Sequence, residues 1–216
     1  MSEVSLSGSE AVEGRRMVVE LTRDGTEALK VGDHEQALFL FKGAFRSSCE
    51  EPSGRGQGVC LFNLGAAYVA VGKPKKGLKC FQRSRQHHQG ADGDMNFNVG
   101  AAYEGVGQLE KALLFYRRAV RGCGPADALL KLAYCSASTE DHVTAGRSFA
   151  QAARAYRLAN QREDAAMALR EAANHTIRSR GAASETEVLQ LLRECLREYW
   201  EGVGDAGLRG KAGRHP

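Results

Sequence analysis

The chain has 216 residues, of which 43% are hydrophobic and 26% charged, an ordinary balance for a folded protein that buries a core. Its net charge of +4 is too small to indicate nucleic-acid binding by itself. The six cysteines form neither a CxxC pair nor a regular framework, which argues against a zinc site or a disulfide scaffold. We therefore expect free thiols in a reducing compartment, the cytoplasm.

The first residues of the chain are rich in serine, and we expect residues 1–9 to be disordered. They contain neither the basic stretch nor the apolar stretch of a signal peptide. The most apolar segment, residues 59–72, is short and contains Asn63, so we expect no membrane span. From residue 10 to residue 200 the sequence predicts a succession of helices.

A pattern of small and aromatic residues recurs in the middle of the chain. Residues 61–84 read LFNLGAAYVAVGKPKKGLKCFQRS, and residues 96–119 read NFNVGAAYEGVGQLEKALLFYRRA. Gly65, Tyr68 and Gly72 each have an identical counterpart 35 residues later. Such spacing is typical of two short helices joined by a turn, because small residues let the helices approach while aromatic rings fill the space between them.

The same pattern extends to both sides of these two stretches. Gly32, Gly72 and Gly107 take the turn position in three copies. In a fourth copy, Ser136 and Glu140 replace the aromatic residue and the turn glycine, so this copy is degenerate. The pattern predicts four helical pairs, at about residues 18–48, 58–90, 93–125 and 126–158.

The assignment of helices to pairs is ambiguous after residue 140. A predicted helix at 143–159 fits as the second helix of the fourth pair. It also fits as the first helix of a further pair, because Ala153, Tyr156 and Ala165 match the pattern too. Both alternatives predict helices near 126–138, 143–159 and 162–179.

The last predicted helix, residues 185–200, is amphipathic and is the natural cap for the open end of a helical stack. Residues 201–216 are rich in glycine, and we expect them to be disordered. The apolar face of the capping helix is predicted to consist of Val188, Leu191, Leu192, Cys195, Leu196 and Tyr199.

The recurring pattern resembles the tetratricopeptide repeat (TPR), whose unit is about 34 residues long. The resemblance implies an all-α fold, a right-handed α-solenoid of helix–turn–helix repeats with a C-terminal capping helix, over residues 10–200. It also implies that the first helix of each repeat lines a concave groove that holds peptides. At the groove-facing places of this family the sequence has Arg23, Phe62, Asn63, Phe97, Asn98 and Lys131.

These six residues suit an extended peptide. The amides of Asn63 and Asn98 offer donors and acceptors to a peptide backbone, Arg23 and Lys131 suit carboxylates, and the two phenylalanines suit apolar anchors. The alternative is that the asparagines cap turns or bond between helices, the rings pack in the core and the cations are solvated.

Repeat proteins of this family that bind chaperone tails use a carboxylate clamp of lysine, arginine and asparagine residues. Asn63 matches the asparagine of the second clamp repeat. Thr22 and Thr26 replace the lysine and asparagine of the first, while Asp94 and Asn98 replace the lysine and arginine of the third. We therefore do not expect a chaperone-tail clamp.

Basic residues recur on the predicted second helices, where they favour an acidic partner or RNA, or form a solvated outer face. No metal, cofactor or catalytic set is expected. We predict a non-catalytic adaptor that binds an extended, acidic or acidic–apolar peptide. A structural or self-assembling scaffold is the alternative, followed by RNA or acidic-partner binding through the outer face. The basic residues are Lys73, Lys75, Lys76, Lys79, Arg83, Arg85, Arg117, Arg118 and Arg121.

Overall fold

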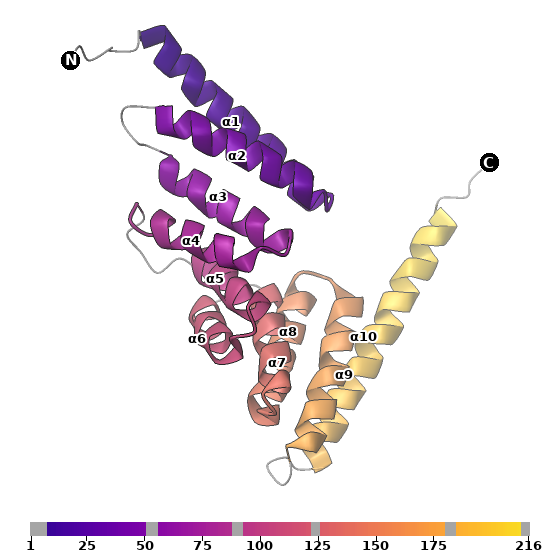
Figure 1. Ribbon diagram of the computed structural model, residues 1–216. Helices are drawn as coiled ribbons and strands as arrows, with labels where there is room; N and C mark the ends of the chain where they lie inside the picture. Colours follow the sequence, from indigo (N-terminus) through magenta and orange to yellow (C-terminus); the bar gives the residue numbers. More distant parts are fainter. Residues whose placement is uncertain (1–7, 51–55, 88–92, 122–125, 180–184, 213–216) are drawn as a thin grey trace. The chain divides into compact units, whose positions relative to one another are not determined.

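The structure is a computed structural model that describes residues 8–50, 56–87, 93–121, 126–179 and 185–212. The described residues are almost entirely helical (Figure 1), as the predicted all-α fold requires. The ten helices are α1 (Gly8–Lys30), α2 (His34–Glu50), α3 (Gln57–Ala70), α4 (Pro74–Ser84), α5 (Gly93–Gly105), α6 (Leu109–Ala119), α7 (Ala126–Ser138), α8 (His142–Leu158), α9 (Arg162–Arg178) and α10 (Glu185–Ala212).

The chain forms two compact units, Met1–Ala112 and Leu113–Pro216. The first unit contains α1 to α5 and the second contains α7 to α10, while α6 crosses the boundary between them. The predicted repeat domain at 10–200 thus spans both units. Of the ends predicted to be disordered, residues 8–9 belong to α1 and 201–212 to α10, while 1–7 and 213–216 lie outside the described residues.

One type of turn joins the helices of each predicted pair. Gly32, Gly72 and Gly107 have φ values of 81°, 74° and 77°, in the left-handed region that glycine adopts readily. The amide after each glycine donates to a carbonyl five residues earlier, as Asp33 N does to Ala28 O at 2.9 Å. This hydrogen bond defines a Schellman motif, which ends a helix and satisfies its last carbonyls.

The same turn also occurs twice in the second unit without glycine. Glu140 and Asn160 have φ values of 59° and 58°. Asp141 N donates to Ser136 O and Gln161 N to Tyr156 O, both at 2.9 Å. Helix α8 is therefore flanked by two turns of this type. It packs against both α7 and α9, so the helices that both alternatives predict are present, and the assignment of α8 to one pair stays a prediction.

Close helix packing in the first unit depends on glycine. The rings of Phe41 and Phe81 are buried against Gly25 and Gly65 on the preceding helices. A β-carbon on Gly25 would lie 2.8 Å from Phe41 Cε1, a distance that real side chains do not tolerate. The adjoining core joins α1, α2 and α3 and consists of Ala28, Ala37, Leu38, Phe41, Leu64 and Ala67.

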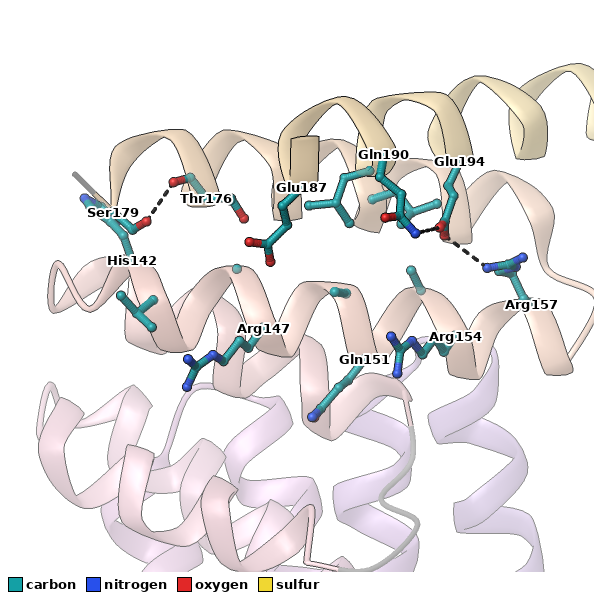
Figure 2. Close-up of a pocket in the computed structure, with 16 residues that line it drawn as sticks. His142, Arg147, Gln151, Arg154, Arg157, Thr176, Ser179, Glu187, Gln190 and Glu194 are labelled. Atoms are coloured by element: carbon teal, nitrogen blue, oxygen red, sulfur yellow. Dashed lines mark hydrogen bonds and ion pairs between the residues drawn. The ribbon is translucent and has the colours of Figure 1, made fainter. Parts of the chain in front are cut away.

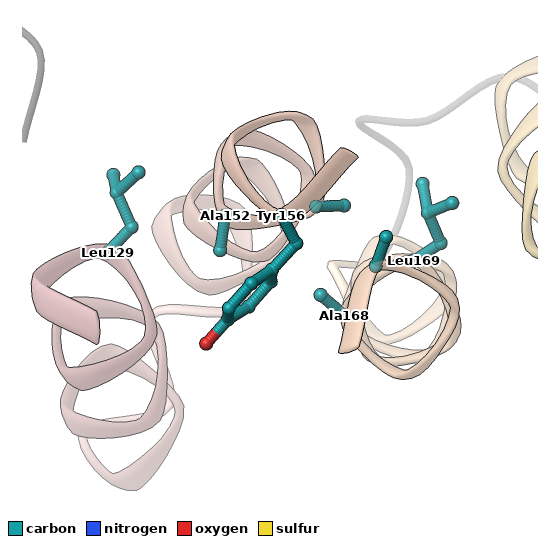
Figure 3. Packing of buried hydrophobic residues seen from close by; sticks show 7 residues of the cluster. Leu129, Ala152, Tyr156, Ala168 and Leu169 are labelled. Atoms are coloured by element: carbon teal, nitrogen blue, oxygen red, sulfur yellow. The ribbon is translucent and has the colours of Figure 1, made fainter. Parts of the chain in front are cut away.

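The core of the second unit is centred on α8. Figure 3 shows the Tyr156 ring of α8 pointing between α7 and α9, next to Ala168 of α9. Phe149, two turns before Tyr156 on the same face of α8, packs with Ala133 of α7 and Ala172 of α9. Both of these aromatic rings sit among small residues, so α7 and α9 pack closely on either side of α8.

Helix α10 packs along α9, but its apolar residues divide between two faces. Leu191 and Cys195 are partly buried against the core of the second unit. Leu192, Leu196 and Tyr199, predicted for the same buried face, are exposed. That prediction was wrong because successive helical positions differ by about 100°, so Leu192 and Leu196, one place after Leu191 and Cys195, turn away from α9. Tyr199 is two turns after Leu192 and shares its exposed face.

Candidate functional site

Five of the six residues predicted to face the groove lie in the first unit, on α1, α3 and α5. Helix α3 contacts both α1 and α5. Arg23 of α1 is exposed, and its Nε donates to Oδ1 of the neighbouring Asp24 at 3.0 Å. Its charge is therefore already partly balanced within its own helix.

The two asparagines have different surroundings. Asn63 is half-buried on α3, and its side-chain amide makes no hydrogen bond to another residue in the described part of the chain. Asn98 is half-buried on α5, and its Nδ2 donates to the Asp94 carbonyl at 2.9 Å. The amide nitrogen of Asn98 thus bonds within its own helix, whereas the whole amide of Asn63 is available to a ligand.

The remaining predicted residues are all half-buried. The Phe62 ring lies 5.9 Å from that of Phe81, centroid to centroid, so it packs within the α3–α4 pair. Phe97 belongs to α5, and Lys131 lies on α7 in the second unit. The six predicted residues therefore divide between two units.

The second unit contains a cleft of about 410 Å³ between α8 and α10, here named the α8–α10 cleft (Figure 2). Ala150, Ala153, Leu169 and Leu191 contribute apolar surface to its lining. Helix α10 directs Glu187, Gln190 and Glu194 towards α8, while the Arg147, Gln151 and Arg154 side chains of α8, which also line the cleft, extend from α8 on the side away from α10. Spacings of three and four residues place each of these rows on one side of its helix.

The arginines of this cleft differ in their partners. Arg157 pairs with two carboxylates of α10, through Nη1 to Glu194 Oε2 at 3.3 Å and through Nε to Glu198 Oε1 at 2.8 Å. Arg147 and Arg154 are exposed, and neither forms an ion pair with any residue that the structure describes. Helix α8 therefore presents two cations whose charge no carboxylate of the described ranges balances.

One end of the cleft carries a histidine pair. The Nδ1 atoms of His142 on α8 and His175 on α9 lie 3.1 Å apart, so one ring donates a hydrogen bond to the other. His175 is only 7% exposed and stacks on Phe149 with ring centroids 5.5 Å apart. Burial, reinforced by His142, lowers the pKa of His175.

Sequence reasoning did not find this cleft or the histidine pair. The paired groups come from helices that are distant in sequence, and only the packing of α8, α9 and α10 brings them together. Among the described residues, no group of three histidine, cysteine or acidic side chains is placed to hold a metal ion. The five described cysteines are free thiols, and Cys123 lies outside the described residues. No described helix is both long enough and apolar enough to cross a membrane.

No family model matches the sequence. Among solved structures, a putative kinesin light chain with TPR-like repeats from Podosopora anserina is similar with a TM-score of 0.64 and 13% identity, over 86% of this chain and 96% of that one. TTC0263, a TPR protein of Thermus thermophilus, has a TM-score of 0.56 and 19% identity over 83% and 98%. MamA protein has a TM-score of 0.58 and 15% identity over 87% and 94%.

Identities this low establish the fold alone. They show that the chain has the helical-repeat fold of TPR proteins, an all-α solenoid of helix–turn–helix units. The class of protein is thus defined by its architecture, and its ligand must be inferred from the side chains of this chain.

Proposed function

We propose that this protein is a non-catalytic interaction adaptor that binds an extended acidic and apolar peptide. The observation that carries the proposal is the pair of exposed cations, Arg147 and Arg154, at the edge of the α8–α10 cleft. Guanidinium groups bind carboxylates through two parallel hydrogen bonds, and the amide of Gln151 between them suits a peptide backbone.

The other side of the cleft orients the peptide. The half-buried Ala150 and Leu191 offer apolar surface to an aliphatic or aromatic anchor. Glu194 of α10 is already balanced by Arg157, so acidic side chains of the ligand are favoured at α8 and disfavoured at α10. A peptide with carboxylates on one side and an apolar residue facing inward matches this arrangement.

The first unit, taken by itself, offers another peptide contact in this proposal. Asn63, with its amide free of bonds to described residues, pairs with the backbone of an extended peptide, while Arg23, Phe62, Phe97, Asn98 and Lys131 stay predictions. At finer grain, residues 20–200 resemble tetratricopeptide repeat protein 24, most specifically at 61–116, a resemblance that supplies no activity. Location in the cytoplasm likewise stays a prediction from the cysteine spacing.

The experiment is selection from a library of random peptides, followed by affinity measurement with the selected sequence. We expect selected peptides to be rich in Asp and Glu around an apolar residue. Arg147→Ala with Arg154→Ala should weaken binding at least about tenfold, since each change removes a charge-assisted bond. The matched control is Arg193→Ala with Arg197→Ala, two exposed arginines of α10 in the same unit. Equal losses in both double variants, or selection of peptides without acidic residues, would contradict the proposal.

The exposed side of α10 favours self-association as a second candidate function. Leu189, Leu192, Leu196 and Tyr199 follow one another at spacings of three and four residues, and Trp200 beside them is 68% exposed. Such spacing forms a continuous apolar seam that a second helix can cover. Sedimentation of the wild type against Leu192→Glu with Leu196→Glu tests this. A monomer at all concentrations in the wild type would exclude this function.

A further inference from the structure

A second cleft, of about 460 Å³, lies in the first unit among α2, α3 and α4, and is here named the α2–α4 cleft. Leu61, Leu64 and Tyr68 of α3 share one side of that helix and line the cleft. Helix α2 contributes Phe45, and α4 contributes the partly buried Cys80. The inner surface of the cleft is therefore apolar and aromatic.

Cations surround this apolar surface. Lys42 and Arg46, one helical turn apart on α2, and Arg83 on α4 line the cleft and are exposed. The Lys42 ammonium lies 5.8 Å from the centroid of the Tyr68 ring, and Lys76 of α4 lies 5.7 Å from it. The Arg83 guanidinium lies 5.5 Å from the Phe45 ring. Contacts with the rings hold these long side chains over the cleft.

No carboxylate among the described residues pairs with these cations. None of the residues that line the cleft is acidic. Lys42, Arg46, Lys76 and Arg83 form no ion pair with any residue in the described part of the chain. Their like charges repel one another across an apolar surface of low dielectric constant. An anionic ligand that binds there reduces this repulsion.

We propose that the α2–α4 cleft is a separate binding site for an acidic peptide segment that inserts one aromatic or aliphatic anchor. The anchor contacts the half-buried Phe45 and Cys80 above the buried Leu61 and Leu64, and flanking carboxylates pair with Lys42, Arg46 and Arg83. Both halves of this recognition are needed, because exposed ion pairs alone contribute little and an apolar contact alone does not select for charge.

The geometry favours a peptide over nucleic acid. Single-stranded nucleic acid binds by stacking its bases on free aromatic faces. In this cleft Lys42 and Lys76 lie over the Tyr68 ring and Arg83 over Phe45. An apolar side chain needs no such face, since it fills the space between the rings and the leucines.

The site is separate from the one assigned above. Helical periodicity places Asn63 on the side of α3 opposite Leu61, Leu64 and Tyr68. Variants of the α2–α4 cleft therefore leave Asn63 unchanged, and Arg147 and Arg154 belong to the other unit. Failure of this inference and failure of the proposed adaptor function are thus distinguishable.

The test uses the full chain and a short fluorescein-labelled peptide of Asp and Glu residues with one central Phe. Lys42→Glu with Arg83→Glu should weaken binding at least about tenfold, since attraction becomes repulsion at two positions. Replacing the Phe of the peptide by Ala should also weaken binding to the wild type. Lys73→Glu with Lys75→Glu is the matched control, because it makes the same charge change on exposed residues outside this cleft. This control should retain affinity within about threefold.

Several outcomes would overturn the inference. Equal weakening of peptide binding in both charge-reversal variants would show long-range attraction without a site. Equal affinity of the wild type for the peptides with Phe and with Ala would show that no anchor is bound. Tighter binding of a single-stranded oligouridylate, lost with Lys42→Glu and Arg83→Glu, would assign the surface to nucleic acid instead. Far-UV circular dichroism establishes whether each variant is folded. If Lys42→Glu with Arg83→Glu is unfolded, the milder double variant Lys42→Ala with Arg83→Ala takes its place in the test.

Discussion

The Phe81 ring lies against the backbone of Gly65, so closely that a β-carbon built on Gly65 would be 2.6 Å from Phe81 Cε1. On the facing helix, a β-carbon on Gly77 would be 2.9 Å from the Gly65 carbonyl oxygen. Helices α3 and α4 therefore approach each other where both lack side chains, and the ring is buried beside that point.

This contact predicts the effect of adding one methyl group. Gly65→Ala should lower the free energy of unfolding of the first unit, because overpacking costs about 1–3 kcal/mol. The gain in helix propensity on replacing glycine by alanine is at most about 1 kcal/mol. Urea unfolding followed by circular dichroism measures the difference. Gly14→Ala is the control, since nothing lies within 4 Å of its added β-carbon, and it should be neutral or stabilising.

The left-handed turn at Glu140 predicts a stabilising substitution. For a residue with a β-carbon, this conformation is less favourable by about 1–2 kcal/mol of free energy. Glu140→Gly should therefore raise the free energy of unfolding of the second unit by about 1 kcal/mol, whereas Glu140→Ala should not. Asn160→Gly should give a smaller gain, because asparagine tolerates the left-handed region. Equal stabilisation by glycine and alanine at residue 140 would mean that backbone conformation is not the cause.

The histidine pair predicts a pH dependence of stability in the second unit. Burial lowers the pKa of His175, assisted by the charges of His142 and Arg178 and opposed by Glu171. The unfolded chain therefore binds a proton more readily than the folded chain does. The free energy of unfolding should be at its full value above about pH 6.5 and should fall as the pH drops through that value towards the folded pKa.

Thermal unfolding between pH 5 and pH 8 measures this dependence. His175→Phe keeps a ring next to Phe149 and removes the titrating group, so the decrease in stability at low pH should become smaller. His34→Gln, an exposed histidine of the first unit, is the control and should retain the decrease. An unchanged profile in His175→Phe would assign the pH dependence to other groups.

The ion pairs of Glu198 predict how α10 is held. Its side chain is 3% exposed and contacts Arg157 at 2.8 Å and Arg162 at 3.2 Å. Removing one member of a buried pair leaves charges unbalanced, so Glu198→Ala should destabilise the packing of α10 on α9 by about 2–4 kcal/mol. Hydrogen exchange of the α10 amides should accelerate accordingly. Glu201→Ala removes a more exposed partner of Arg162 and should cost under about 1 kcal/mol.

The sequence alone determined the helical pairs and their turns. Gly32, Gly72 and Gly107 stand at regular positions, and each has the left-handed conformation that a helix-ending glycine favours. Gly65 and Phe81 likewise specify close packing by residue type and spacing. These features are local, so a periodic pattern predicts them without knowledge of distant contacts.

Tertiary structure decided the packing of α8 and the character of the candidate sites. Sequence left two alternatives for α8, and only the structure shows that α8 packs against both α7 and α9. Arg147, Arg154 and Arg157 look equivalent along one helix. Whether the charge of an arginine is balanced depends on carboxylates of α10. Arg157 pairs with Glu194 and Glu198, which are about 40 residues away along the chain. Electrostatic pairing acts through space, and spacing along the chain does not encode it.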